Sequence, residues 1–215
     1  MCDARQVRLN IISNLEKLNE VIGVKILSES LLPAIIQLSH DKQWRVRMAM
    51  IEFMPLLANQ LGVSFFDKEL TQRCAHWLSD DVASIREIAA VNLRKLTEIF
   101  GVQWANSQII HQVEQLSNAQ SYLVRITSIH ALCEIGFSVD ERTRVDRILP
   151  AILRQCQDPI ANVRFNVAKG IHRLIPHLPK QSLSDTVKPQ LQRLSRDIDA
   201  DVQFFSVEAL NDCPV

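Results

Sequence analysis

The feature that most constrains the fold is a dipeptide, a β-branched residue followed by arginine, that returns at a constant interval of 39 residues. It begins with Val7-Arg8 and continues at Arg47, Arg86, Arg125 and Arg164, and a sixth copy has glutamine in place of the arginine. A constant period near forty residues is typical of stacked-repeat proteins, in which each unit packs on its neighbours. The chain is therefore predicted to be one quasi-linear array.

Other positions keep the same interval. Six residues before the arginine position stands an aspartate in four copies, at Asp41, Asp80, Asp158 and Asp197, while Ala119 breaks the series. Fifteen residues after the arginine position, the chain places residues that favour turns. These residues are Gly23, Gly62, Gly101, Asp140 and Pro179.

Each unit is predicted to contain two helices. Apolar residues from Val46 to Leu61 fall at spacings of three and four, which predicts a helix over 44–61 that ends at Gly62. A preceding helix is predicted near 25–39, and Pro33 should bend it because proline lacks the N–H that a helix uses. Pro55 should bend the second helix in the same way.

A bent first helix, a turn that opens with aspartate and a second helix that opens with Val-Arg resemble the HEAT repeat. The resemblance predicts an all-α HEAT-repeat α-solenoid over the whole chain. Its parts would be a lone second helix at 1–23 and five repeats, at 24–62, 63–101, 102–140, 141–179 and 180–215, the last one truncated.

The recurring charges have a physical interpretation. Asp41 precedes the second helix, where a carboxylate can accept hydrogen bonds from free N–H groups. Arg47 lies in the first turn of that helix, which is unfavourable for a cation, so a nearby acid is expected. The aspartate of an adjacent repeat would supply it, which gives a structural ladder along the array. The members would be Asp41, Arg47, Asp80, Arg86, Arg125, Asp158, Arg164 and Asp197, and the pair of Arg125, beside Ala119, should be the weakest.

Composition limits the partners and the cellular location that are expected for the chain. The 24 basic and 24 acidic residues balance, which argues against nucleic acid or an acidic membrane surface as partner. The sequence has no apolar run long enough to cross a membrane and no signal-peptide core. The five cysteines form no C-x-x-C pair, so free, mostly buried thiols in a reducing compartment are expected. The predicted location is cytoplasmic, with the nucleus as an additional one.

Catalytic patterns are missing from the sequence. The six histidines form no H-E-x-x-H or related metal motif, and His130 with Glu134 lacks a second copy. No glycine-rich phosphate loop or nucleophile elbow occurs. The chain is therefore predicted to be no enzyme and to need no cofactor.

The turns within the repeats are predicted to stack along one edge and to bind a protein partner. Tryptophan and arginine contribute strongly to many interfaces, so Trp44 and Arg45 are the expected anchors. The alternative for Trp44 is that it folds back onto its own repeat. Trp77 and Trp104 are expected in the core or in lateral packing. The full predicted set is Lys42, Gln43, Trp44, Arg45, Asp81, Val82, Ala83, Tyr122, Pro159, Ile160, Ala161, Asn162, Asp199 and Asp201.

Longer strings narrow the resemblance further. Trp44-Arg-Val-Arg47, the segments 52–58 and 60–63, and Ala161-Asn-Val-Arg-Phe-Asn-Val-Ala-Lys169 resemble the C-terminal third of the scaffolding A subunits of protein phosphatase 2A. So do the segments 7–15, 19–23, 31–35 and 65–67. In that family the corresponding turns hold the catalytic subunit. The resemblance implies that Trp44 and Arg45 are the firmest contacts with the catalytic subunit, followed by Tyr122 and the turn 159–162. Ala83 departs from the family's tyrosine, and the segment 103–145 matches poorly.

The resulting hypothesis is a non-catalytic scaffold that binds the catalytic subunit of a serine/threonine phosphatase. One alternative is a HEAT adaptor for another protein, of the transport-receptor kind. Another is a repeat enzyme that acts on nucleic acid or through a metal.

The start of the chain adds a prediction. Apolar residues from Val7 to Ile22 line one face of a helix without a first-helix partner, so this helix should fray or join two copies. The absence of earlier repeats predicts that no regulatory subunit is recruited.

Overall fold

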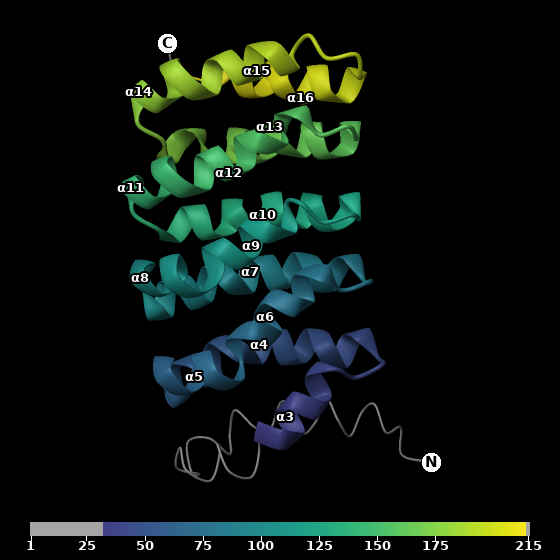
Figure 1. The fold of residues 1–215 in the computed structure, drawn as a ribbon, viewed down its shortest axis with the longest axis vertical. Coiled ribbons are helices and arrows are strands. Elements are labelled where there is room, and N and C mark those ends of the chain that lie inside the picture. The colour runs from purple at the N-terminus through teal and green to yellow at the C-terminus, as the bar shows by residue number, and fades with distance from the viewer. Residues whose placement is uncertain (1–31, 214–215) are drawn as a thin grey trace. The chain divides into compact units, whose positions relative to one another are not determined.

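The computed structural model describes residues 32–213, and every regular element in that range is helical (Figure 1). The chain divides into a first unit up to Phe100 and a second unit from Gly101. The predictions for the helix at 1–23, including its exposed face and self-association, lie outside the described residues.

The first unit contains two long helices that follow the predicted positions. They are α4 (Trp44–Leu61) and α7 (Ala83–Phe100), and they pack side by side. The shorter elements of the unit are α3 (Leu32–Ser39), α5 (Val63–Glu69), α6 (Thr71–His76) and the 3₁₀ turn η2 (Trp77–Ser79).

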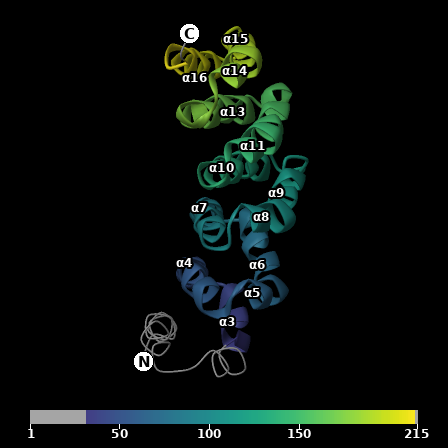
Figure 2. The same cartoon turned by 90° about the vertical axis from the view of Figure 1, so that its left-hand side faces the viewer.

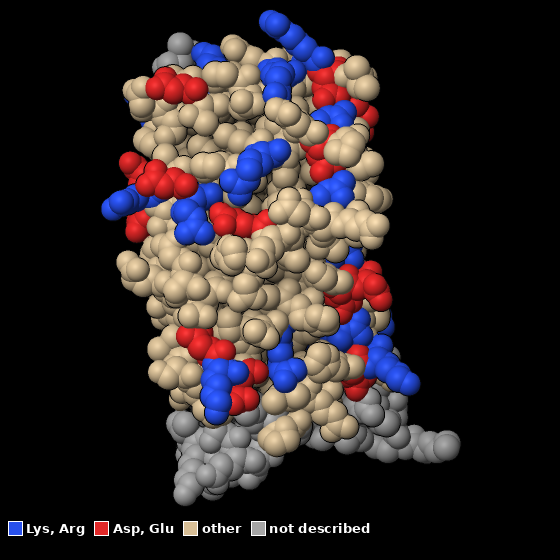
Figure 3. All heavy atoms as spheres, viewed as in Figure 1, with Lys and Arg blue, Asp and Glu red and all other residues tan. Residues whose placement is uncertain are grey.

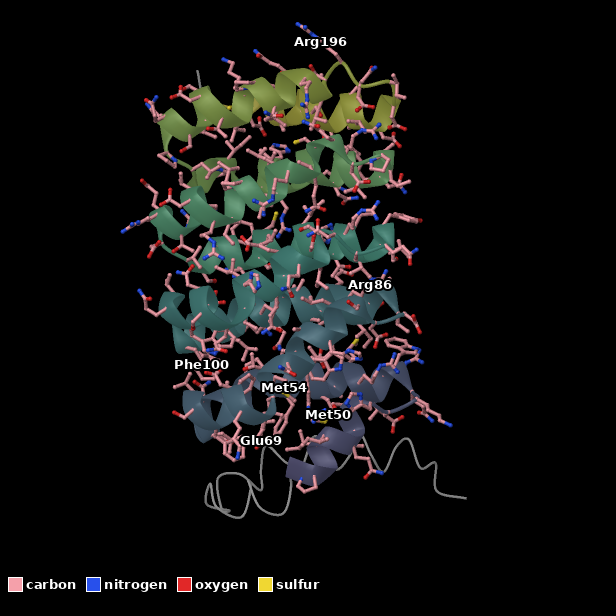
Figure 4. All side chains as sticks on the ribbon, viewed as in Figure 1. Met50, Met54, Glu69, Arg86, Phe100 and Arg196 are labelled. Carbon is pink, nitrogen blue, oxygen red and sulfur yellow. The ribbon has the colours of Figure 1, made fainter. Side chains whose placement is uncertain are left out.

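The sequence pattern correctly predicted the second helix of the repeat at 24–62. Helix α4 spans the predicted 44–61, and Met50 and Met54 point from it into the interior, fully buried (Figure 4). Gly62 follows with φ of 74°, a left-handed value that favours glycine, and Gly101 ends α7 with φ of 86°. Pro55 lies inside α4, and the helix continues through it. For the predicted first helix, only α3 is described, with Pro33 as its second residue.

The second unit has two layers that alternate along the chain (Figure 2). One layer is formed by the long second helices α10 (Tyr122–Ser138), α13 (Ala161–Leu174) and α16 (Ala200–Asn211). Helix α13 packs between α10 and α16. The other layer contains the first helices, whose main segments are α9 (Ile110–Leu116), α12 (Leu149–Leu153) and α15 (Lys188–Leu194).

Each first helix of the second unit is interrupted in the same place. A short α segment leads into five residues of π-helix and then into the main segment. The short segments are α8 (Val102–Trp104), α11 (Glu141–Thr143) and α14 (Lys180–Ser182). The π segments are η3 (Ala105–Ile109), η4 (Arg144–Ile148) and η7 (Leu183–Val187), and the 3₁₀ turns η5 (Arg154–Gln157) and η6 (Ile175–His177) complete the unit.

Proline does not cause these interruptions by itself. Pro150 and Pro189 stand at the starts of α12 and α15, but His111 occupies the matching place in α9, which has the same π segment before it. The π turn therefore belongs to the repeat, and proline, which lacks an N–H, is tolerated where it falls.

The core is made of aliphatic residues from both layers. Leu132, Ile152 and Ile171 are completely buried in the second unit, as are Leu57 and Leu93 in the first. Trp77 and Trp104 are buried, as predicted. The cysteines Cys74, Cys133, Cys156 and Cys213 are free and buried. Burial raises the pKa of the Cys74 and Cys133 thiols to about 12, so both stay protonated near neutral pH.

Candidate protein-binding turns

The turns within the repeats are organised by their aspartates. The Oδ1 atom of Asp80 accepts a hydrogen bond from the N–H of Val82 at 2.9 Å, and Asp158 does the same for Ile160 at 2.9 Å. Asp41 accepts from Gln43 at 2.8 Å and Asp197 from Asp199 at 3.0 Å. The carboxylates thus accept from N–H groups of the turn just before the second helix. The prediction had them accept instead from the free N–H groups of the helix itself. Such a bond two residues along is the usual way in which aspartate fixes a turn.

Each ladder arginine reaches in two directions. Arg164 donates from Nε and Nη2 to the two carboxylate oxygens of Asp197, both at 2.8 Å, and from Nη1 to the carbonyl oxygen of Asp158 at 2.8 Å. It therefore joins the turn of its own repeat to the aspartate 33 residues further along. This two-pronged geometry is the strongest that arginine forms with a carboxylate.

The same arrangement occurs in both units. In the first unit, Arg47 binds Asp80 with two bonds of 2.8 Å and the Asp41 carbonyl with one of 2.7 Å. In the second unit, Arg125 binds Asp158 at 2.6 and 2.9 Å and the carbonyl of Ala119 at 2.9 Å. The side chains in the three pairs are only 7–15% exposed.

The prediction that Arg125 has the weakest pair was wrong. The partner of each arginine is the aspartate of the following repeat, so the replacement at Ala119 does not touch the pair of Arg125 with Asp158. In the repeat pattern, the arginine whose acid position is Ala119 is Arg86. Among residues 32–100, Arg86 forms no ion pair; its Nη1 donates to the carbonyls of Asp80 and Asp81 at 2.7 and 3.1 Å. Its side chain lies at the turn end of α7 (Figure 4).

The ion pairs perturb the titration of their carboxylates. For Asp158, burial pushes the pKa up, but the hydrogen bonds from Arg125 and from the Ile160 N–H, together with the arginine charges, outweigh it and leave the pKa below its ordinary value. For Asp197, the hydrogen bond from Arg164 is the main cause of a lowered pKa. Both arginines have raised pKa values for the same reason. The charged forms of these pairs are therefore the stable ones.

Outside these pairs, the turns expose a second set of side chains, which we call the tip residues. In the first unit the tip residues come from two turns. Lys42, Gln43 and Arg45 are exposed and Trp44 is half-buried, with the Arg45 guanidinium 4.4 Å from the centre of the indole ring. In the next turn Asp81 and Ala83 are exposed and Val82 is half-buried. Stacking of arginine on tryptophan is favourable and holds both groups in place at the surface.

In the second unit, the tips are more apolar. Tyr122 is 38% exposed at the start of α10, and Ile160 is 39% exposed before α13. Pro159 and Asn162 are exposed and Ala161 is half-buried. Asp201 is exposed as well, whereas the carboxylate of Asp199 caps α16 through the N–H groups of Asp201 and Val202.

Sequence reasoning missed two tip residues of the second unit. Ile198 is 98% exposed and stands between Asp197 and Asp199, and Leu123 is 42% exposed beside Tyr122. Burial of this isoleucine against a partner would be favourable, because it removes apolar surface from water. The signal was available, since Ile198 occupies the same place in its repeat as Pro159, which was in the predicted set.

The remaining predicted features have ordinary structural roles. His130 Nε2 lies 3.1 Å from Asn166 Oδ1, and Glu134 pairs with Arg173, so neither forms a metal site with the other. Within residues 32–213, no three His, Cys, Asp or Glu side chains come together as a metal site would require, and no helix is long and apolar enough to cross a membrane. On the face shown in Figure 3, the described basic and acidic side chains are interspersed.

Comparison with known proteins agrees with this architecture. Residues 148–178 match the model of the HEAT repeat. The fold resembles that of Cex1p with a TM-score of 0.66, at 14% identity, over 88% of this chain and 37% of that protein.

Proteins similar in sequence indicate a narrower family than the fold comparison does. The regulatory A subunit of protein phosphatase PP2A from Saccharomyces cerevisiae is 42% identical over 128 residues. In its described residues the chain is an all-α repeat protein that contains a HEAT repeat and resembles the regulatory A subunit of PP2A.

The beta isoform of the human 65 kDa regulatory A subunit of serine/threonine-protein phosphatase 2A is 48% identical over 52 residues, which are 24% of this chain and 9% of that protein. The yeast match covers 56% of this chain and 20% of the relative, so the chain spans about a fifth of the length of that relative. The likeness to the regulatory A subunit of PP2A is thus confirmed over part of the chain, and the assignment of repeat boundaries and tip residues stays a prediction.

Proposed function

We propose that the chain is a non-catalytic, cytoplasmic scaffold whose tip residues bind the catalytic subunit of a PP2A-type serine/threonine phosphatase. The observation that carries the proposal is the exposure of large apolar and aromatic side chains at turns whose backbone is fixed from behind by buried ion pairs. These side chains are the half-buried Trp44, which stacks on Arg45, and the exposed Tyr122, Leu123, Ile160 and Ile198.

A fixed turn suits binding because little conformational freedom is lost when the partner docks. The arginine and aspartate bonds hold the turn backbone from the inner side, as Arg164 does for the Asp158 and Pro159 carbonyls. The neighbouring side chains, Trp44 stacked on Arg45 among them, then stand at defined positions on the surface. Exposed groups of this type contribute most of the free energy in many protein interfaces.

The names of the relatives support the choice of partner. Both names describe a regulatory subunit of protein phosphatase 2A, which is one part of a phosphatase assembly. Because the chain spans only part of their length, a catalytic subunit is a proposed partner. The alternative, an adaptor for an unrelated protein, gives no binding in the experiment below.

The test measures the affinity of the whole chain for purified PP2A catalytic subunit by calorimetry. We expect saturable binding, and the double variant Ile160→Ser with Ile198→Ser should weaken it about thirtyfold, which is a loss of about 2 kcal/mol. Val91 is the matched control, since it is 37% exposed in the middle of α7, away from every turn. Val91→Ser should bind like the unaltered chain. Absence of binding, or equal losses for the tip and control variants, would overturn the proposal.

A further inference from the structure

Two histidines in the first unit line two neighbouring hollows. His40 follows α3 and His76 ends α6, and their ring centres are 6.0 Å apart. One hollow has a volume of about 380 Å³, and its charged lining residues are Asp41, Asp80 and Asp81 together with Lys42 and Arg47. Three carboxylates against two cations make this hollow unfavourable for an anion.

The other hollow has the opposite character. It has a volume of about 330 Å³ and is lined by His40, Lys68, Glu69, Gln72, Arg73 and His76. Glu69 lies at the end of α5 (Figure 4), and its Oε1 is 3.6 Å from Lys68 Nζ, which offsets its charge. Arg73 forms no ion pair among the described residues. The hollow therefore holds an arginine and two imidazoles that no carboxylate neutralises directly.

The contacts of Arg73 define the protonation of His40. Arg73 Nη1 lies 2.9 Å from His40 Nε2, and Arg73 Nε donates to the Glu69 carbonyl at 3.3 Å. Because a guanidinium can only donate, His40 accepts at Nε2 and carries its ring proton at Nδ1. This contact exists only while His40 is neutral, since an imidazolium has no acceptor nitrogen.

We propose that this hollow is a binding site for a tetrahedral oxyanion of the phosphate type, supplied either as the free ion or as a phosphorylated side chain of a partner. Arg73, Gln72 and the two imidazoles offer N–H donors from α6 and from the end of α3, and Lys68 adds charge at the rim. Donors that converge from several directions fit a tetrahedral ion, which accepts through several oxygens. The site does not depend on the proposed phosphatase partner, because it lies on the short helices rather than on the tip residues.

The charged residues that line the two hollows make the oxyanion hollow the more basic one. Its charged lining residues are Lys68, Glu69 and Arg73. Those of the other hollow are Asp41, Lys42, Arg47, Asp80 and Asp81.

The experiment uses inorganic sulfate as the probe, because it is a dianion near neutral pH. Sulfate is added to the whole chain at constant ionic strength, and the imidazole Cε1–H signals are followed by NMR. We expect saturating shifts for His40 and His76. The other histidines of the described region serve as internal references, and they should not saturate.

Variants separate the site from general ionic effects. Arg73→Gln should abolish saturation, and Lys68→Gln, at a side chain 80% exposed and so harmless to folding, should weaken affinity by about threefold. Arg94→Gln is the matched control, an arginine that pairs with Glu98 on the surface of α7, and should bind sulfate like the unaltered chain. The proposal is overturned if neither histidine saturates, or if folded Arg73→Gln shows the same saturation.

A second arm identifies the source of the ion. Capped phosphoserine is titrated in place of sulfate. Tighter binding than sulfate assigns the site to a phosphorylated side chain of a partner, and equal or weaker saturable binding assigns it to the free ion. If phosphoserine and sulfate both fail to saturate, no oxyanion site exists here.

Discussion

The inner side of the turns is nearly the same from repeat to repeat, whereas the residues on the outer side of the same turns change. On the inner side, the arginine Nε to aspartate Oδ2 distances are 2.8, 2.6 and 2.8 Å in three turns. On the outer side, the corresponding turns present Trp44 with Arg45, then Tyr122 with Leu123, then Ile160. The repeated inner bonds fix the backbone path, so the outer residues can change without altering the fold. This comparison predicts that inner residues govern stability and outer residues govern binding.

The largest effect on stability is expected at a complete pair. Arg164→Met should lower the free energy of unfolding by about 2–4 kcal/mol, because it leaves the Asp197 carboxylate partly buried without its cation and frees two carbonyls. Urea unfolding followed by circular dichroism measures the loss.

A double variant locates the cause of that loss. Adding Asp197→Asn to Arg164→Met removes the unpaired charge, so the two changes together should cost less than the sum of each alone. Strictly additive losses, or a loss below about 1 kcal/mol for Arg164→Met, would contradict the role given to the pair.

Acid should weaken the same pairs without a mutation. The pKa values of Asp158 and Asp197 are lowered from the ordinary 3.8, so the folded state holds their protons less tightly than the unfolded state. Their stabilisation is complete above about pH 4 and is lost as the pH falls through the lowered values. Unfolding free energies measured from pH 6 down to pH 2 should fall steeply in this window, and less steeply in Arg164→Met. An identical slope in both proteins would contradict this assignment.

The outer side should show the opposite pattern. Trp44→Ala should weaken binding of the PP2A catalytic subunit by about 2 kcal/mol while changing stability by less than about 1 kcal/mol, because the half-buried indole stacks on Arg45 at the surface. Calorimetry and urea unfolding of one variant give both numbers. A large loss of stability would show that Trp44 belongs to the core and that the binding interpretation of this turn is wrong.

The incomplete inner position should give an intermediate loss. Arg86 donates to two carbonyls of its own turn and forms no ion pair among residues 32–100, so Arg86→Met leaves no carboxylate uncompensated within the first unit. We expect a loss of about 1 kcal/mol, clearly below that of Arg164→Met, in the same urea experiment. Equal losses at the two positions would mean that the backbone bonds, and not the aspartate, carry the effect.

The sequence was sufficient for helix α4 and for the residues of three ion pairs, because both follow from periodic spacing. It predicted neither the π segments of the first helices nor the lack of an ion pair for Arg86 among residues 32–100. Helix α4 and the buried positions of Trp77 and Trp104 needed only local patterns. The direction of each pair could not be read, since a constant interval does not tell whether Arg125 meets the aspartate before or after it. The place of Ile198 in the turn could have been read from its match with Pro159, but its 98% exposure could not, because that depends on how the turn before α16 projects.

The smallest effect on stability is expected for an arginine–carboxylate pair that is exposed to solvent. Arg94 and Glu98 lie one helical turn apart on α7, with side chains 43% and 50% exposed and a distance of 3.0 Å. Water screens the attraction and both side chains lose rotational freedom, so exposed pairs at this spacing contribute only about 0.3–0.5 kcal/mol. Arg94→Met should therefore cost no more than about 0.5 kcal/mol, and 1 M salt should remove most of it. A loss close to that of Arg164→Met would mean that the contact between the charges is sufficient by itself. The small loss expected here instead assigns the strength of the inner pairs to their burial and to the turn carbonyls that the same guanidinium holds.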